Sequence, residues 1–318
     1  MASIPPQRLL FFGTPDFAVP SLEALAESSH AIVGVISQPD RPRGRGRKLE
    51  PTPVRAAADA LQLPVLQPEK VGSDEALAWM RAKTPTLGIV VAFGQFLPRA
   101  VRELPPLGLI NAHGSLLPRH RGAAPIQHAI LAGDTVTGIS VMRVVREMDA
   151  GPECLRIETP IGTDETAGEL FERLGPLAGQ ALCRAVDQIA SGDARFQEQD
   201  ASQATFAPKL DRSFSQLQWS RPRAEILRRI RATTPWPGCS LELRRSARTF
   251  KLLRVRDGGP FAEASVRAGH VDIPEDRLRV AALDGWVEVL KLQPPGRRPM
   301  DAKEFLHGAA IQAGEEVK

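Results

Sequence analysis

The sequence predicts an α/β protein with a doubly wound, mostly parallel sheet, followed by a small antiparallel β-barrel for which the oligonucleotide-binding (OB) type is one option. Apolar strands rich in Val, Ile and Leu alternate with helix-patterned segments over residues 1–191. A polar stretch without apolar periodicity follows at 192–210. Beyond it, short alternating strands are separated by Gly, Pro and Asp. We therefore expect domains at 1–191 and 211–318, joined by a linker at 192–210.

In the first domain, the strands are continuous apolar runs, which is typical of parallel strands buried on both faces. The expected strands are Arg8–Thr14, Ala31–Ser37, Leu87–Phe93, Gly108–Gly114, Gly138–Val145 and 154–161. The expected helices are Phe17–Ser28, Pro53–Leu61, 73–82, 125–133 and Thr166–Ser191, the last with Thr163 or Asp164 as its N-cap. Ligands of such sheets bind at the carboxyl ends of the strands, near the point where strand order reverses.

In the second domain, one helix precedes several short strands with alternating apolar residues. The helix is expected at Ala224–Ala232, and the strands lie within 239–245, 249–256, 268–274, 277–283 and 285–296. This pattern of short strands and frequent turns predicts a small antiparallel barrel.

The net charge of +4 is distributed unevenly along the 318 residues. Residues 211–318 hold 20 basic and 14 acidic side chains, whereas residues 1–210 hold 21 and 23. A basic final third beside a mildly acidic front favours a polyanionic partner such as nucleic acid, although surface charge also serves solubility.

Composition also bears on the compartment. No run approaches the roughly 18 apolar residues of a membrane span, and the first residues lack the pattern of a signal peptide. Three widely spaced cysteines, Cys154, Cys183 and Cys239, suit neither a disulfide framework nor a zinc site. We expect a cytoplasmic protein without membrane contact.

The first expected turn argues against a nucleotide cofactor. Residues 13–20 (GTPDFAVP) lie where a dinucleotide-binding fold has GxGxxG, but Gly13 is the one glycine present. Neither GxGxxG nor GxxxxGK[ST] occurs elsewhere in the chain. NAD and ATP are therefore poor candidates despite the doubly wound pattern.

The densest group of polar residues lies at 110–127 (INAHGSLLPRHRGAAPIQ). Asn111 and His113 are two residues apart at the end of an apolar strand, so their side chains share one face. One interpretation is that both are capping side chains with local hydrogen-bond partners. The other makes His113 an acid or base and Asn111 an amide donor to a developing oxyanion.

Asp149 supplies a third polar group. It lies in a Gly-flanked loop (VREMDAGP) just after the expected strand Gly138–Val145, and its carboxylate can orient and polarise His113 as a triad aspartate does. The sequence has neither a GxSxG nucleophile elbow nor the ligand spacing of a metal site. An Asn–His–Asp set without metal or nucleophile suits direct group transfer from an activated carrier, through a tetrahedral intermediate.

Taken together, these residues resemble the methionyl-tRNA formyltransferases. The resemblance covers most of the chain, from about Leu9 to Trp236, in seven segments that keep that family's order: FFGTPDFAVPSLEAL, QPDRPRGRGRKL, VVAFGQFLP, INAHGSLLPRHRGAAPIQ, EMDAGP, ATFAPKL and TPWPG. HGSLLP with a downstream DAG is shared by the wider 10-formyltetrahydrofolate-dependent transferases. The arginine-rich insertion and PWPG point to the tRNA-specific branch.

The resemblance implies a Rossmann-like first domain, an OB-like second domain, and a monomer. It implies transfer of the formyl group of 10-formyltetrahydrofolate to the methionine amine of initiator Met-tRNA. The implied catalytic residues are Asn111, His113 and Asp149. The implied folate-binding residues are Phe93, Gly94, Ser115, Leu116, Leu117 and Pro118. The implied tRNA-binding residues are Arg41, Arg43, Arg45, Arg47, Lys48 and Lys209.

The arginine-rich insertion at 38–52 has two interpretations. Five cations lie within the eight residues from Arg41 to Lys48. Gly44, Gly46 and the prolines disfavour any regular element, so the stretch can be a solvated linker. In the context of the resemblance, it is instead a flexible cationic arm that orders on tRNA phosphates or bases.

Two other functions compete with tRNA formylation. The first is a related formyl-folate enzyme that acts on a nucleotide sugar, a small amine or water and needs neither the cationic insertion nor a basic second domain. The second is a nucleic-acid-binding protein whose first domain has lost catalysis. The joint presence of Asn111, His113 and Asp149 argues against the second alternative.

Overall fold

A computed structural model describes residues 5–43, 48–262, 266–308 and 311–318. The chain divides into two compact units. The first unit comprises Met1–Pro125, Thr137–Thr159 and Phe171–Phe206, and the second comprises Ile126–Val136, Pro160–Leu170 and Ala207–Lys318. Residues 192–206 of the expected linker thus belong to the first unit.

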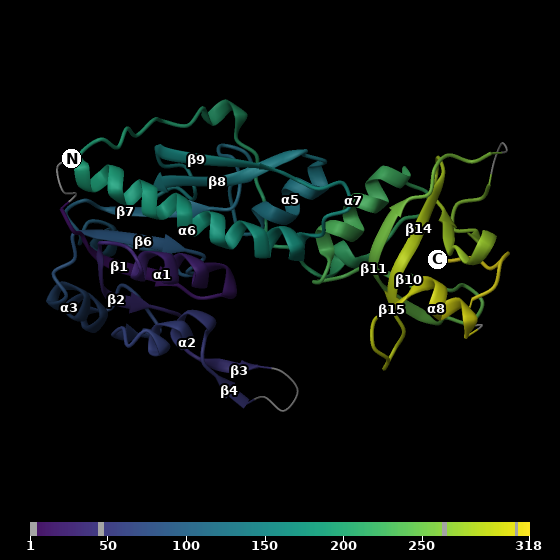
Figure 1. Cartoon of the computed structure of the whole chain (residues 1–318), viewed down its shortest axis with the longest axis horizontal. Helices are drawn as coiled ribbons and strands as arrows, with labels where there is room; N and C mark the ends of the chain where they lie inside the picture. The colour runs from purple at the N-terminus through teal and green to yellow at the C-terminus, as the bar shows by residue number, and fades with distance from the viewer. Residues whose placement is uncertain (1–4, 44–47, 263–265, 309–310) are drawn as a thin grey trace. The chain divides into compact units, whose positions relative to one another are not determined.

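The first unit is built on a seven-stranded sheet with the strand order β5-β2-β1-β6-β7-β8-β9 (Figure 1). Its strands are β1 (Arg8–Gly13), β2 (Ala31–Ile36), β5 (Val65–Leu66), β6 (Leu87–Val91), β7 (Leu109–His113), β8 (Val136–Arg143) and β9 (Glu153–Pro160). The pairs from β5 to β7 are parallel, and β8 runs antiparallel to β7. The predicted mostly parallel, doubly wound sheet is confirmed, and strand order reverses between β1 and β6.

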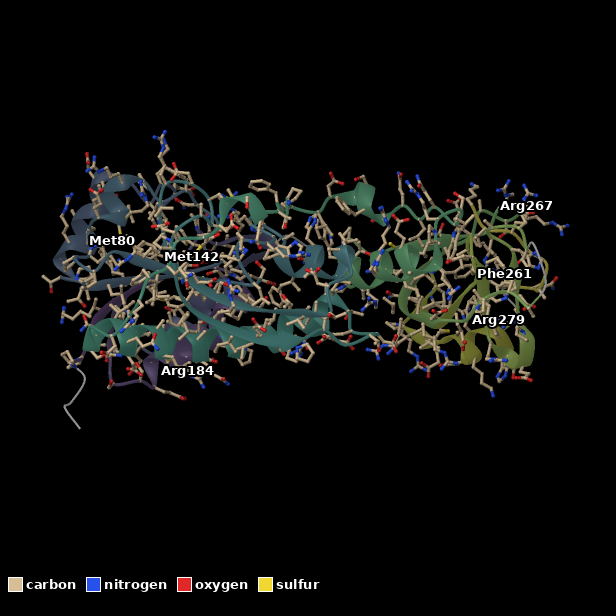
Figure 2. All side chains as sticks on the ribbon, turned by 90° about the horizontal axis from the view of Figure 1, so that it is seen from above. Met80, Met142, Arg184, Phe261, Arg267 and Arg279 are labelled. Carbon is tan, nitrogen blue, oxygen red and sulfur yellow. The ribbon has the colours of Figure 1, made fainter. Side chains whose placement is uncertain are left out.

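Helices bury both faces of this sheet. The helices of the first unit are α1 (Val19–Ala26), α2 (Pro53–Ala60), α3 (Asp74–Ala82), α4 (Arg99–Arg102) and most of α6 (Ala167–Ser191), with the 3-10 turns η1 (Asp16–Ala18) and the exposed η2 (Ala201–Gln203), whereas most of α5 (Pro125–Ala132) belongs to the second unit. Leu10 and Phe12 of β1 pack in one core cluster with Met80 of α3, which Figure 2 labels. Leu9 and Phe11, on the opposite face, are equally buried. Burial on both sides explains why these strands lack polar alternation.

Side-chain caps begin three of these helices. Thr52 Oγ1 accepts from the Arg55 amide at the start of α2, and Ser73 caps α3 in the same way. At the start of α6, Thr166 Oγ1 accepts from the Glu169 amide while the Glu169 carboxylate accepts from the Thr166 amide. This reciprocal pair is a capping box. The predicted cap at Thr163 or Asp164 was therefore wrong, because Glu169 lies three residues after Thr166.

The basic insertion contains a short two-stranded ribbon. β3 (Arg41–Arg43) pairs antiparallel with β4 (Lys48–Glu50), and Figure 1 shows the pair projecting beside α2. Arg45 and Arg47 lie outside the described residues. The expectation that no regular element forms here was wrong, because the ends of the insertion pair with each other across the glycines.

The second unit is built on a six-stranded antiparallel sheet. Its elements are η3 (Arg212–Ser215), α7 (Arg223–Thr233), β10 (Ser240–Glu242), β11 (Thr249–Asp257), β12 (Val271–Asp272), η4 (Pro274–Asp276), β13 (Arg279–Ala281), β14 (Trp286–Gln293), β15 (Met300–Asp301) and α8 (Ala302–His307). The strand order is β10-β11-β14-β13-β12, and β15 also pairs with β14. Phe250, Leu252, Val287 and Val289 lie in its core. Figure 2 labels Arg279 of β13, whose guanidinium stacks on Trp286.

The C-terminal residues connect the two edges of this sheet. Within the described residues, edge strands β10 and β12 do not pair with each other. Instead the Arg244 amide donates to the Glu316 carbonyl oxygen, and the Val271 amide donates to the Glu315 carbonyl oxygen. The predicted antiparallel domain is confirmed, but the expected OB-like barrel is not closed within the described residues: isolated bridges to the C-terminal residues lie between its two edges.

Candidate active site

His113 and Asp149 are brought together, as the sequence predicted. His113 ends β7, and its side chain is 6% exposed. The Nε2 donates to the His120 carbonyl oxygen at 2.9 Å, and the Nδ1 lies 3.6 Å from Asp149 Oδ2. Both ring nitrogens thus face oxygen atoms. The Nδ1–Oδ2 separation of 3.6 Å is longer than a hydrogen bond.

Asn111 lies beside this pair on β7. It is two residues before His113 and therefore on the same face of the strand. Its side chain and that of Asp149 line a mostly apolar cavity of about 530 Å³. No residue in the described part of the chain hydrogen-bonds to the Asn111 side chain, so its amide is available to a ligand.

The position of Asp149 depends on the direction of β8. The register pairs Ile110 with Arg143 and His113 with Ser140, so β8 ends beside the start of β7. The loop after Arg143 must therefore turn back along β7 before Asp149 can reach His113. A strand parallel to β7 would have delivered this loop directly to the carboxyl edge.

Local backbone geometry makes this turn possible. Asp149 has a φ of 52°, in the left-handed region that aspartate tolerates better than most residues. A Cβ at Gly151 would lie 2.0 Å from the Arg143 carbonyl oxygen, so this position requires glycine. The Gly122 amide then donates to Asp149 Oδ2 at 2.8 Å and holds the carboxylate beside His113.

The cavity includes few of the residues expected to contact folate. Gly94 lines it, three residues after the end of β6 and close to the point where strand order reverses. Phe93 does not, because its ring is buried and stacks edge-on against Phe12 with 5.6 Å between centroids. The turn Ser115–Pro118 is also absent from the lining.

The Ser115–Pro118 turn is instead held by the protein itself. Ser115 Oγ donates to the Arg119 carbonyl oxygen at 2.7 Å. The Leu117 amide donates to Ser140 Oγ, and the Leu117 carbonyl oxygen accepts from Arg156. These bonds fix the turn that leads from His113 to His120.

The resemblance placed the segment 91–98 beside the pterin pocket, and Gln95, Phe96 and Leu97 of that segment do line the cavity, but the wall that follows β8 was missed by reasoning from the sequence. The other lining residues lie in β6 or β8, in the segments after them, or after His113: Val90, Gln95, Phe96, Leu97, Ala123, Met142, Arg143, Val144, Val145, Arg146, Glu147 and Met148. Figure 2 locates Met142 within the first unit. The segment VVREM, directly before Asp149, was the available signal, since a loop that delivers one site residue also brings its neighbours.

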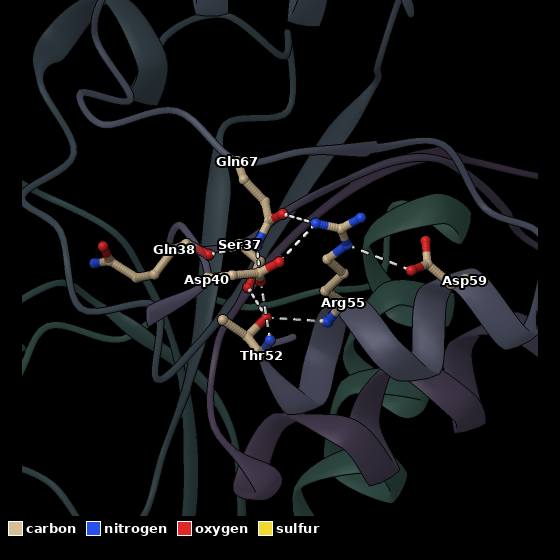
Figure 3. A network of polar contacts seen from close by, with 7 residues as sticks. All are labelled: Ser37, Gln38, Asp40, Thr52, Arg55, Asp59 and Gln67. Carbon is tan, nitrogen blue, oxygen red and sulfur yellow. Dashed lines mark hydrogen bonds and ion pairs between the residues drawn. The ribbon is translucent and has the colours of Figure 1, made fainter. Parts of the chain in front are cut away.

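A polar network holds both ends of the basic ribbon (Figure 3). Asp40, just before β3, accepts from Gln67 Nε2 at 2.6 Å, from Arg55 Nη1 at 2.7 Å and from the Thr52 amide at 3.2 Å. Gln67 Nε2 also donates to the Gln38 carbonyl oxygen at 2.8 Å. The chain is thus tied at its entry to the ribbon and at its exit to the start of α2.

The Asp40 carboxylate is stabilised in its charged form. Burial is the largest single influence and raises its pKa, but the hydrogen bonds from Gln67 and Thr52 and the charge of Arg55 together outweigh burial. The pKa of Asp40 therefore lies below its ordinary value of 3.8. Arg41, the next residue, is exposed, and its side chain takes no part in these hydrogen bonds.

Other expected tRNA-binding residues are only partly located. The backbones of Arg43 and Lys48 pair in the ribbon. Lys209 is exposed and lies in the second unit, three residues after the end of the first.

Neither a metal-binding cluster nor a membrane-spanning helix occurs among the described residues. Within the described ranges, no group of three or more His, Cys, Asp or Glu side chains is placed to hold a metal ion. No helix in that part of the chain is long and apolar enough to span a bilayer.

Comparison with known proteins places the chain. The model of the formyl transferase family matches residues 7–186, and the model of the formyl transferase C-terminal domain matches residues 209–310. A protein of Symbiobacterium thermophilum named methionyl-tRNA formyltransferase is 42% identical over 308 residues, which cover 96% of this chain and 94% of that protein. A protein of the same name from Pseudomonas paraeruginosa is 42% identical over 92% of this chain and 93% of its own length.

Solved structures show the same fold at low sequence identity. An N-formyltransferase from Helicobacter canadensis, in complex with folinic acid and dTDP-3-aminofucose, has a TM-score of 0.66 at 16% identity, covering 91% of this chain and 99% of that one. HypX from Aquifex aeolicus in complex with tetrahydrofolic acid has a TM-score of 0.61 at 16% identity, covering 95% of this chain and 47% of that one. The matches at 42% identity extend through both units, and the chain therefore belongs to the methionyl-tRNA formyltransferase family.

Proposed function

We propose that the chain transfers the formyl group of 10-formyltetrahydrofolate to the α-amino group of methionine on initiator Met-tRNA. The observation that carries this proposal is that Asn111 and Asp149 line a mostly apolar cavity, while His113 lies behind them, outside the lining, with its Nδ1 3.6 Å from Asp149 Oδ2. The relatives named methionyl-tRNA formyltransferase support the acceptor, because they match along both units. The solved relatives in complex with tetrahydrofolic acid or folinic acid support the donor.

The cavity suits a folate. Its volume of about 530 Å³ is that of a small-molecule site, where a few polar groups orient a ligand held mainly by apolar contacts. Phe96 and Met148 line it although their surfaces are 70% and 73% exposed, so each has apolar area to bury against a ligand ring. The polar residues of the lining are Gln95, Asn111, Arg143, Arg146, Glu147 and Asp149.

The folate derivative supplies the formyl carbon. As the methionine amine nitrogen bonds to this carbon, the bond from the carbon to the folate nitrogen breaks, and negative charge develops transiently on the formyl oxygen. The Asn111 amide, with no partner among the described residues, donates to that oxygen. A donor of this kind typically contributes about 2.7–4 kcal/mol to the transition state.

In this proposal, His113 and Asp149 transfer the proton from the methionine amine to the departing folate nitrogen. The attacking amine must lose one proton, and the departing folate nitrogen must gain one. The imidazole can hold that proton because Asp149 faces its Nδ1 and stabilises the imidazolium. In the observed ring orientation, Nε2 is bonded to the His120 carbonyl oxygen, so His113 donates to the formyl oxygen only after releasing that bond.

The tRNA is bound by cationic segments outside this cavity. In this proposal, Arg41, Arg43, Arg45, Arg47 and Lys48 contact the acceptor stem, and Lys209 lies near its end. Residues 1–191 carry catalysis, 192–210 connect the domains, and the basic residues 211–318 bind tRNA. The excess of 20 basic over 14 acidic side chains in the last segment supports this division.

We place the enzyme in the cytoplasm as a monomer. All three cysteines carry free thiols, which supports a reducing compartment.

The acceptor is tested by supplying labelled 10-formyltetrahydrofolate together with initiator Met-tRNA, elongator Met-tRNA or free methionine. We expect label on initiator Met-tRNA alone. Label on free methionine, or equal label on both tRNAs, contradicts the proposed acceptor. A dTDP-linked amino sugar is the further control, because the Helicobacter canadensis relative was solved with one; formylation of that sugar in preference to Met-tRNA would establish the rival function.

The catalytic roles are tested with Asn111→Ala, His113→Ala and Asp149→Ala. Each change is expected to lower kcat by about a hundredfold or more, whereas the Kd for the folate changes much less, because the lost interactions form in the transition state. Equal losses in kcat and folate affinity, with the fold intact by circular dichroism, would contradict these assignments.

The role of the ribbon is tested with the triple variant Arg43→Ala, Arg45→Ala, Arg47→Ala. We expect weaker use of tRNA, with the slope of log KM against log salt reduced by roughly 0.7–0.9 per lost phosphate contact. Folate binding should be unchanged. Arg99→Ala is the control, since this exposed arginine pairs with Glu103 on α4; identical tRNA kinetics in the two variants would restore the linker interpretation.

A further inference from the structure

The stretch Gln199–Phe206, which we term the strap, makes hydrogen bonds to the segments that carry the candidate active-site residues. It falls within the expected linker, yet its backbone runs beside the turn that follows His113. The Arg121 amide donates to the Thr205 carbonyl oxygen at 2.8 Å, and the His120 amide donates to Thr205 Oγ1 at 2.8 Å. The strap therefore supports the residue whose carbonyl oxygen accepts from His113 Nε2.

Gln199, at the start of the strap, connects this turn to the Asp149 loop. Its Oε1 accepts from Arg121 Nε at 3.1 Å and from Arg121 Nη2 at 2.7 Å. Its Nε2 donates to the Asp149 carbonyl oxygen at 2.9 Å and to the Gly151 carbonyl oxygen at 2.8 Å. The side-chain amide of Gln199 thus accepts from the turn that follows His113 through its oxygen and donates to the Asp149 loop through its nitrogen.

The Asp149 loop depends on such outside support. It has left the ladder of β8, and Asp149 is held in a left-handed conformation that costs energy without compensating contacts. The side chain of Met148, next to Asp149, is largely exposed and contributes little packing. Arg121, which holds Gln199, is 9% exposed and immediately precedes Gly122, whose amide donates to Asp149 Oδ2.

We propose that Gln199 is a positioning residue that holds the Asp149 carboxylate against His113. The inference rests on the proposed function and extends it to a residue that contacts neither substrate nor the reacting atoms. These hydrogen bonds require an amide side chain at position 199, because it must both accept from Arg121 and donate to two carbonyl oxygens. A glutamate can still accept from Arg121, but it has no proton for the Asp149 and Gly151 carbonyl oxygens, which its own oxygen would repel.

Gln199→Glu separates these two functions of the side chain. It keeps the contact with Arg121 and removes the donation to the Asp149 loop. Gln203→Glu is the matched control, because Gln203 lies in the same strap, is exposed, and donates its amide proton to Asp200 Oδ2 at 2.7 Å. Both variants add the same charge and remove one amide, but among the described residues the side chain of Gln203 hydrogen-bonds to Asp200 and not to the Asp149 loop.

The first measurement is the kinetics of formyl transfer to Met-tRNA. For Gln199→Glu we expect kcat to fall between about tenfold and a hundredfold, as for a small displacement of a catalytic group. The KM for each substrate should change by less than about threefold, and the acid limb of the kcat–pH profile should move. Gln203→Glu should match the wild type in all three. A Gln199→Glu enzyme with wild-type kcat, or one that loses only thermal stability, would refute the positioning role.

The second measurement is hydrogen exchange of the backbone amides, which requires no activity. Exchange of the Gly122 amide, the donor to Asp149 Oδ2, should accelerate in Gln199→Glu and remain unchanged in Gln203→Glu. Unchanged exchange in both variants would overturn the inference. If the wild-type chain fails to formylate Met-tRNA, the proposed function fails, and exchange alone decides whether Gln199 holds the loop.

Discussion

The polar network at the base of the basic ribbon leads to a quantitative prediction about tRNA use. Asp40 is 15% exposed and accepts three hydrogen bonds, one of them from Arg55 (Figure 3). Asp40→Asn preserves the size of the side chain and one acceptor oxygen for Gln67 and Thr52. It replaces the oxygen that faces Arg55 with an amide donor, so one charge-assisted bond is lost.

The magnitude follows from that single bond. A hydrogen bond to a charged group contributes about 1.5–3 kcal/mol. The Arg55 side chain is 39% exposed, so solvent screens its charge and the lower end applies. We expect the free energy of unfolding to fall by about 1.5 kcal/mol. If tRNA binds only the anchored ribbon, loosening its base by that amount raises the KM for Met-tRNA at most roughly tenfold.

The assay compares the KM for Met-tRNA with the KM for the formyl donor in Asp40→Asn and Asp59→Asn. Asp59 is the matched control, because it also contacts Arg55, at 3.4 Å, but it is 57% exposed and does not bond to the ends of the ribbon. Only Asp40→Asn should raise the KM for tRNA, and the KM for the donor should stay constant in both. Equal tRNA kinetics in the two variants would refute the reasoning.

Four further predictions concern stability and reactivity. Since the pKa of Asp40 is lowered on folding, its charge stabilises the fold above pH 3.8, and the difference in unfolding free energy between wild type and Asp40→Asn should shrink as pH falls below that value; a constant difference in urea titrations would contradict this. Gly151→Ala should cost about 1–3 kcal/mol of unfolding free energy and lower kcat, because its Cβ would meet the Arg143 carbonyl oxygen, whereas Gly308→Ala, with ordinary contacts, should leave kcat unchanged. Thr166→Val should cost about 1 kcal/mol through loss of the α6 cap and Thr163→Val much less, as measured by urea unfolding; the reverse order would restore the cap expected from sequence. Burial raises the pKa of the Cys154 thiol from 9.0 to about 11, so a disulfide reagent at pH 8 should modify it at least about tenfold more slowly than free cysteine until the chain unfolds, and rapid labelling of the native protein would oppose this.

Much of the first unit was predictable because its signals are local. Continuous apolar runs predicted β1, β2, β6 and β7, since a strand buried on both faces has no place for polar alternation. The period of two in a strand placed Asn111 and His113 on one face without any knowledge of the fold. The helix at α6 was likewise predicted from spacing, and only its cap was misplaced.

The remaining features depend on partners distant in the sequence. Nothing near Ser140 indicates that β8 runs antiparallel to β7, yet that direction decides how the Asp149 loop reaches His113. The pairing of β3 with β4 joins two segments that local preference alone argued against, because glycines and prolines are frequent in this part of the sequence.

Gln199 shows most clearly the difference between features that local sequence predicts and features that depend on distant partners. By sequence alone it was one polar residue in a polar stretch, with no periodicity to mark it. In the tertiary structure its amide touches Arg121, Asp149 and Gly151, which lie 78, 50 and 48 positions away. The sequence by itself determined which segments become strands and helices and which side chains share a strand face, because neighbours within a few residues decide both. Only the tertiary structure decided which loops meet, because the donors and acceptors left over by the strands and helices find their partners across the whole folded chain.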